Sequence, residues 1–184
     1  MAESACDSDA AHRLALHDAV QKYQVPLTGY ARTLLGDLDR ARDVAQDTLL
    51  KMCQQPRQTF EQDLARRLAP WLFAVCRNRC IDIIRKERRM TTTEPTTLDQ
   101  QQAASQGDRT RPLSVVEQRD TADALLGLVD ALPDNQREVV QLRFNGQLPY
   151  REIAHVTGHS VSHVGVLLHE AIKTLRVQML RLTA

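Results

Sequence analysis

Basic residues gather on one predicted helix, in a pattern suited to binding nucleic acid. The segment PWLFAVCRNRCIDIIRKERR carries Arg77, Arg79, Arg85, Lys86, Arg88 and Arg89, against only Asp82 and Glu87. Such cations attract phosphates and release counterions on binding them. Trp71 and Phe73 lie one turn upstream and Phe60 precedes them, and aromatic rings beside a basic groove stack unpaired bases. The alternative, which we favour for Trp71 and Phe73, is that these rings are core and the arginines a solvated face.

A second segment, residues 37–47, has the opposite charge pattern. Its sequence is DLDRARDVAQD, and helical spacing places on roughly one face Asp39, Asp43, Gln46 and Asp47. An acidic face suits a protein partner better than DNA. A solvated helix surface is the alternative that these residues leave open.

Residues 150–169 fit a helix-turn-helix, in which two short helices present the second one to a major groove. Ala154 is small, as needed where two helices cross steeply, and Gly158 can take the left-handed conformation that ends the first helix. Val164 can wedge between the helices, and Ser160 is a suitable N-cap for the second. A plain helical hairpin is the alternative, but the spacing favours DNA binding.

The elements that must position these residues are all predicted to be helices. Caps and breakers predict first-half helices over about 11–24, 26–36, 37–53 and from Pro70 through the basic segment. The second half is expected to contain a helix from Ser114 to about Ala131, a break at 132–134, a helix from Gln136 to Phe144, and the helix-turn-helix. No window alternates as a strand does, so we expect an all-α fold.

A polar segment separates the two halves. Residues 91–113, TTTEPTTLDQQQAASQGDRTRPL, have little to bury and cannot offset their ordering entropy. We therefore expect two small helical domains, at 11–90 and 116–184, joined by a flexible linker at 91–115. The second domain contains the helix-turn-helix.

Composition excludes several other classes of protein. The 184 residues are 42% hydrophobic and 26% charged, as in soluble globular proteins, and the net charge of +1 means that a DNA surface must come from local clustering. No signal-peptide pattern or membrane-length apolar run is present, which favours a cytoplasmic protein. The cysteines form no CxxC pair and have no partners at zinc spacing, so we expect no metal site and no cofactor.

Three ordered motifs resemble the extracytoplasmic-function (ECF) subfamily of sigma-70-type RNA polymerase sigma factors. RDVAQDTLLKM resembles region 2.2, PWLFAVCRNRCIDIIRKERR resembles regions 2.3 to 2.4, and ALPDNQREVVQLRFNGQLPYREIAHVTGHSVSHVGVLLHEA resembles regions 4.1 to 4.2. The resemblance implies a polymerase subunit that directs promoter-specific initiation and nucleates DNA melting. It also implies core RNA polymerase and promoter DNA as partners and, as for many members, an anti-sigma factor.

The resemblance assigns the residues to three contact surfaces. Core-polymerase binding falls to Asp39, Asp43, Gln46 and Asp47. Recognition of the −10 element falls to Trp71, Asn78, Arg79, Asp82, Arg85, Lys86, Arg88 and Arg89, with Asn78 near the pocket for a flipped base. Recognition of the −35 element falls to Arg151, Ser160, Ser162, His163, Val166, Leu167, His169 and Lys173.

The second helix of the helix-turn-helix departs from the family pattern. Members often carry Lys-Ser-Arg where this chain has Gly165, Val166 and Leu167, and Arg where it has Glu170. Arg and Lys are the usual guanine readers and phosphate anchors, so we expect weak or altered −35 recognition and more reliance on the −10 contacts. Gly165 also lowers helix propensity by about 1 kcal/mol relative to Ala. Pro149 replaces the customary Ser cap and is expected in the first turn.

Two other functions compete with this assignment. A stand-alone helix-turn-helix regulator would explain the second half but leave the acidic face and the basic helix without a role. An enzyme has little support, since the sequence shows no glycine-rich phosphate loop, paired catalytic carboxylates or nucleophile motif. The histidines at 155, 159, 163 and 169 could suggest a metal, but they fall in the DNA-reading unit.

Overall fold

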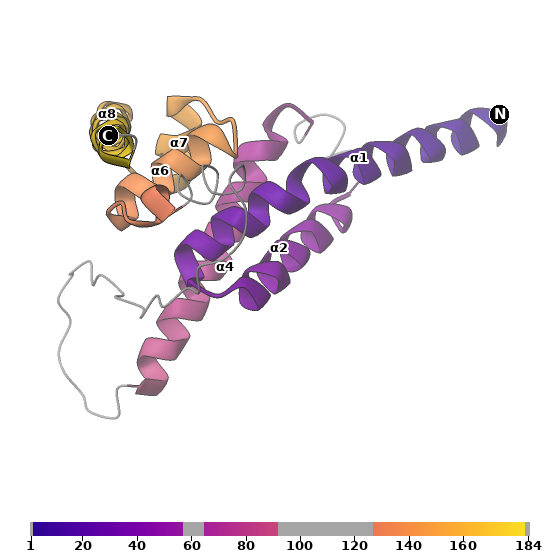
Figure 1. Ribbon diagram of the computed structural model, residues 1–184. Coiled ribbons are helices and arrows are strands. Elements are labelled where there is room, and N and C mark those ends of the chain that lie inside the picture. The colour runs from indigo at the N-terminus through magenta and orange to yellow at the C-terminus, as the bar shows by residue number, and fades with distance from the viewer. Residues whose placement is uncertain (1, 57–64, 92–126, 183–184) are drawn as a thin grey trace.

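The computed structural model describes residues 2–56, 65–91 and 127–182, and its regular elements there are all helices (Figure 1). The first half contributes α1 (Ala2–Leu35), α2 (Leu38–Cys53) and α4 (Ala65–Thr91). The second half contributes α6 (Asp134–Phe144), α7 (Tyr150–Thr157) and α8 (Val161–Leu182). The expectation of an all-α fold is confirmed. The linker expected at 91–115 lies almost wholly outside the described residues.

Local signals place the boundary between α1 and α2 as expected. Gly36 ends α1 with φ 75°, a left-handed conformation that favours glycine. Asp37 is the N-cap of α2, and its carboxylate accepts a hydrogen bond from the Arg40 amide at 2.8 Å. Val44 and Met52 of α2 are buried against the other helices of the first half.

The break expected between Gln24 and Pro26 is wrong, because α1 is continuous and contains Pro26. A proline inside a helix removes one backbone hydrogen bond and crowds the preceding turn. Leu27, Tyr30 and Ala31 are fully buried just beyond it, and the burial of this face holds the helix together.

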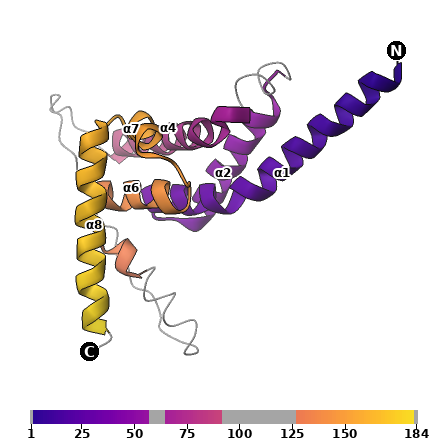
Figure 2. The ribbon, with the colours of Figure 1, turned by 90° about the horizontal axis from the view of Figure 1, so that it is seen from above.

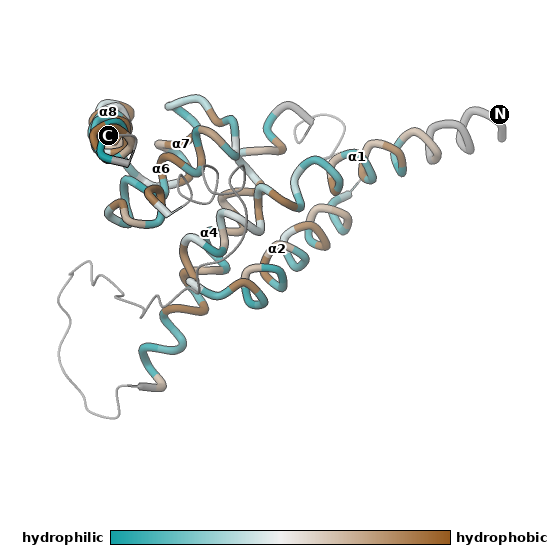
Figure 3. The backbone as a smooth tube through the Cα atoms, viewed as in Figure 1, coloured by the Kyte–Doolittle hydropathy of each residue, from teal (hydrophilic) through white to brown (hydrophobic). Residues whose placement is uncertain are grey.

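Helix α4 begins earlier than expected, at Ala65. Arg67 interrupts it with non-helical angles, φ −119° and ψ 17°, so that Pro70 falls near the start of the piece beyond the kink. Leu72 and Phe73 of this piece are fully buried, whereas the far end of α4 extends past α2 and is hydrophilic (Figures 1 and 3).

The two halves are packed against each other. Helix α1 contacts α6 and α4 contacts α7, while α8 crosses the end of this arrangement (Figure 2). One cluster of buried residues includes members of both halves, among them Tyr30, Phe73, Val139 and Leu168. The positions of the surface helices are therefore fixed by a shared core.

Candidate functional site

The helix-turn-helix has the geometry that its sequence predicts. Gly158 adopts φ 78° and its amide donates to the Ala154 carbonyl at 2.9 Å. The Ser160 hydroxyl accepts a hydrogen bond from the His163 amide at 3.2 Å, which caps α8. Val164 is fully buried, as expected for the residue that wedges between the two helices. Pro149 is a small correction, because it occupies the N-cap position of α7, outside the first turn.

The outer face of α8 is polar but poor in cations. The exposed predicted contacts of this unit are Arg151, Ser160, Ser162, His163, Val166, His169 and Lys173. Leu167 is a correction, since its side chain is 4% exposed and packs in the core. It follows Val166 by about 100° around the helix and so faces inward. Lys173 is the one cation that α8 adds to these contacts.

Two histidines contact each other where the turn leads into α8. The rings of His159 and His163 meet edge to face, with centroids 4.9 Å apart. Burial lowers the pKa of His159, and the neighbouring His163 lowers it further. Within the described ranges no group of three or more His, Cys, Asp or Glu residues is placed to hold a metal ion.

The basic end of α4 presents its cations to solvent. The exposed residues of this surface are Asn78, Arg79, Asp82, Arg85, Lys86, Arg88 and Arg89. Trp71 is half-buried against the core, and Phe73 is fully buried with its ring at 5.3 Å from that of Tyr30. The core interpretation of Phe73 is confirmed, while Phe60 lies outside the described residues.

The acidic face of α2 is exposed throughout. Its members are Asp39, Asp43, Gln46 and Asp47. Asp39 pairs with Arg42 at 3.0 Å and Asp47 with Arg79 at 3.4 Å. No ion pair with another described residue involves Asp43. An acidic surface on α2 therefore adjoins the basic surface on α4.

Arg77 is a further correction, because it does not belong to the solvent-facing cations. Its Nε donates to Glu138 Oε1 at 2.8 Å, and the Tyr30 hydroxyl donates to the same oxygen at 2.8 Å. Burial raises the pKa of Tyr30 well above its usual range, and Glu138 raises it further. Burial lowers the pKa of Arg77, but Glu138 and Tyr30 together raise it by more, so the Arg77 pKa is higher than usual. Sequence reasoning missed this cluster because no local pattern links positions on three different helices.

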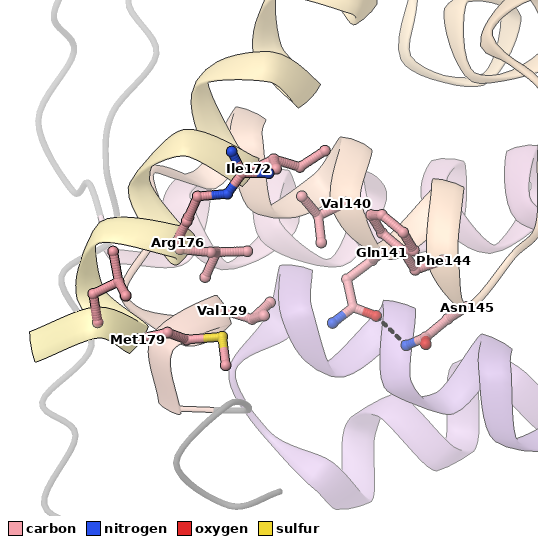
Figure 4. Close-up of a pocket in the computed structure, with 10 residues that line it drawn as sticks. Val129, Val140, Gln141, Phe144, Asn145, Ile172, Arg176 and Met179 are labelled. Carbon is pink, nitrogen blue, oxygen red and sulfur yellow. Dashed lines mark hydrogen bonds between the residues drawn. The ribbon is translucent and has the colours of Figure 1, made fainter. Parts of the chain in front are cut away.

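An apolar groove of about 790 Å³ lies between α6 and α8 (Figure 4). Its apolar lining includes Val129, Val140, Phe144, Ile172, Leu175 and Met179. Phe144 is 60% exposed there, although its helical spacing resembles that of a core residue. Sequence reasoning missed this groove, because helical periodicity marks an apolar face but does not indicate what covers it.

The described cysteines are free thiols. Cys76 and Cys80 are fully buried on α4, in agreement with their interpretation as small apolar residues. A hydrogen bond with Cys80 raises the pKa of Cys76, and burial adds to the shift. None of the described helices is long and apolar enough to cross a membrane.

Comparison with known proteins identifies the two halves separately. Residues 19–90 match the family model for sigma-70 region 2, and residues 128–177 match the one for sigma-70 region 4. The ECF RNA polymerase sigma factor SigL of Mycobacterium tuberculosis is 32% identical over 175 residues, covering 95% of this chain and 93% of SigL. The ECF sigma factor SigM of Bacillus subtilis is 25% identical, covering 89% of this chain and 94% of SigM.

Two solved structures share the fold. One is the sigma factor RpoE of Bartonella quintana in complex with the anti-sigma factor NepR, with a TM-score of 0.58, 21% identity, and coverage of 88% of this chain and 96% of RpoE. The other is CnrH in complex with the cytosolic domain of CnrY, with a TM-score of 0.56, 20% identity, and coverage of 95% and 94%.

Proposed function

The chain belongs to the extracytoplasmic-function subfamily of sigma-70-type RNA polymerase sigma factors. We propose that one of its exposed surfaces binds core polymerase and that two others bind the −10 and −35 promoter elements. It is a sigma factor that directs promoter-specific transcription. Sigma factors are DNA-binding initiation factors rather than catalysts. We assign residues 11–90 to polymerase binding and the −10 element, 91–115 to the linker, and 116–184 to the −35 element.

The acidic face of α2 is the proposed contact with core polymerase. Its carboxylates lie on a helix that the Arg40–Glu87 and Asp47–Arg79 pairs tie to α4. A fixed acidic surface is complementary to a basic one and steers association with it. Asp43 is the central residue of this face in our proposal, because it is exposed and keeps its charge available.

The basic end of α4 is the proposed contact with the −10 element. Arg85, Lys86 and the cations that follow are exposed and can bind phosphates. Asn78 is exposed on the same helix, where a flipped base would be received. Extruding a base costs a few kcal/mol in lost stacking, so contacts that hold the base and its phosphates favour melting.

The outer face of α8 is the proposed contact with the −35 element, with an altered mode of recognition. Val166 is 52% exposed in the middle of this face, where an apolar side chain can contact a thymine methyl group. His163 and Ser162 supply hydrogen bonds. Arg151 of α7 and Lys173 of α8 are the proposed phosphate contacts.

One observation carries the whole proposal: an exposed acidic helix and an exposed basic helix are joined side by side in the first half. A regulator that acts without polymerase needs only the second half. The two solved neighbours were each studied with a bound partner, NepR or CnrY, the first of which is an anti-sigma factor. An anti-sigma factor is therefore a further proposed partner of this chain.

Co-elution of the purified chain with core polymerase tests the proposal. We expect a stable complex that produces run-off transcript from a cognate promoter. A chain that binds the promoter specifically but does not co-elute with core polymerase would instead be a stand-alone regulator. Asp18→Arg is a matched control for charge changes on α2, because Asp18 is exposed on α1 and belongs to none of the proposed faces.

A further inference from the structure

The exposed side of α8 is a stripe of short polar and apolar side chains. Ser162, Val166 and His169 follow one another at helical spacing along this side and are exposed. Val164 and Leu168 are buried on the opposite side of the helix, which packs against α6 and α7. Because the buried side fixes how α8 is turned about its own axis, the stripe is presented to solvent in one orientation.

Val166 lies at the centre of this stripe and is 52% exposed. Its neighbours are small, since Ser162 lies one turn before it and Gly165 directly precedes it. Neither packing nor a left-handed backbone requires glycine at position 165, where an added Cβ would lie 3.9 Å from Tyr150 Cε2, an ordinary contact. The missing side chain lets the edge of a base pair approach Val166 closely.

An apolar side chain can recognise only one feature of a base pair in the major groove. Guanine presents two acceptors there, cytosine presents an amino donor and adenine presents one of each, whereas thymine adds a methyl group to its acceptor. Val166 has no hydrogen-bonding group, so it gains by contact with that methyl group and would leave the acceptors of guanine unpaired. The centre of the stripe therefore favours thymine.

Glu170, one turn beyond Val166, selects against guanine at the neighbouring base pair. Its Oε2 accepts a hydrogen bond from Gln136 Nε2 at 3.2 Å, which ties the carboxylate to α6. A carboxylate can only accept hydrogen bonds, and guanine presents only acceptors in the major groove. The amino group of adenine or cytosine is the donor that this carboxylate can bind.

We propose that Val166 and Glu170 determine which −35 elements this chain accepts: thymine at the base that faces Val166, and adenine or cytosine, but not guanine, at the base that faces Glu170. The inference rests on the proposed function, in which α8 binds the −35 element. Neither contact is a bidentate pair of the kind that arginine forms with guanine. The element therefore contributes specificity with little affinity.

Selection from a randomised DNA library provides the first test. Holoenzyme reconstituted from core polymerase and the chain is incubated with duplexes randomised over both promoter regions, and the duplexes that it opens are sequenced. We expect a −35 motif with thymine at one position and adenine or cytosine beside it. Val166→Arg should replace that thymine by guanine, and Glu170→Arg should admit guanine at the neighbouring position, because arginine binds guanine O6 and N7. A misfolded chain cannot gain a new base preference.

Deoxyuridine provides the second test, because it differs from thymidine only in lacking the methyl group. Replacing the selected thymidine by deoxyuridine should lower the affinity of the wild-type holoenzyme about threefold, as expected for one buried methyl group. The Val166→Ala holoenzyme should bind both promoters equally. Val177→Ala is the matched control, since Val177 is 44% exposed on the same helix, about 16 Å further along, and this variant should keep the full response.

The outcomes separate this inference from the sigma-factor assignment. If the wild-type holoenzyme opens no member of the library, the proposed function fails and the inference fails with it. If it opens promoters that have guanine at the position controlled by Val166, or that share no −35 motif, the inference is overturned and the assignment stands. A response to deoxyuridine that is absent, or that persists unchanged in Val166→Ala, also overturns it.

Discussion

Asp47 of α2 and Arg79 of α4 form an ion pair, with Oδ2 and Nη2 3.4 Å apart. Each residue belongs to a different proposed surface, Asp47 to the polymerase contact and Arg79 to the −10 contact. The pair therefore joins the two surfaces at their common edge. Binding of polymerase at one face would orient the other toward DNA, and changes at each face should have separable effects.

Reversing the charge at Asp43 should weaken core binding and leave promoter contacts intact. We expect Asp43→Arg to lower the affinity for core polymerase by about tenfold, because a repulsive charge replaces an attractive one in the interface. Titration of labelled chain with core polymerase measures this, with Asp18→Arg as the control. Equal affinities for Asp43→Arg and Asp18→Arg would argue against the α2 face.

Removing cations from the end of α4 should reduce the salt dependence of promoter binding. For the holoenzyme carrying Arg85→Ala and Lys86→Ala, we expect the slope of log K against log salt to become shallower by about 1.5 to 2. Each phosphate contact that is lost means that fewer counterions are released when the promoter binds. Arg13→Ala, an exposed change on α1, is the control. A slope that does not change would place the DNA elsewhere.

The −35 contact should be weak in this chain. Footprinting of the holoenzyme is expected to show partial −35 protection, and Val166→Arg should strengthen it by adding a phosphate- or guanine-binding group to the exposed face. His163→Ala should have a smaller effect than loss of the α4 cations. Strong, sequence-specific protection that disappears in His163→Ala would refute a weakened region 4.

Ionisation of Tyr30 should destabilise the folded structure at high pH. Burial raises the pKa of this phenol, so the folded chain keeps its proton while the unfolded chain loses it above about pH 10. The contribution is therefore constant below about pH 10 and falls above it, by up to about 1.4 kcal/mol per pH unit. The free energy of unfolding of Tyr30→Phe should lack this component. Parallel pH curves for the two proteins would contradict the assignment.

Local features of the fold could be predicted because each depends on a few adjacent residues. Asp37 caps α2, Gly158 turns the chain between α7 and α8, and Ser160 caps α8, as their types and positions indicate. The wedge at Val164 follows from its spacing within the helix-turn-helix. The exposed polar faces of α2 and α4 also agree with helical periodicity.

The errors arose where tertiary packing decides the outcome. Pro26 stays within α1 because the buried residues that follow it outweigh the lost hydrogen bond. Leu167 turns inward because α8 packs that side against its neighbours. Arg77 leaves the cationic surface because Glu138, distant in sequence, meets it across the two halves. None of these contacts has a local signature in the sequence.

Promoter opening is the most direct test of the central claim. Permanganate reactivity of thymines in the −10 element should appear only when core polymerase, the chain and a cognate promoter are combined, and should be lost with Arg85→Ala and Lys86→Ala. Reactivity produced by core polymerase without the chain, or specific promoter binding by the chain with no opening when core polymerase is added, would contradict the account.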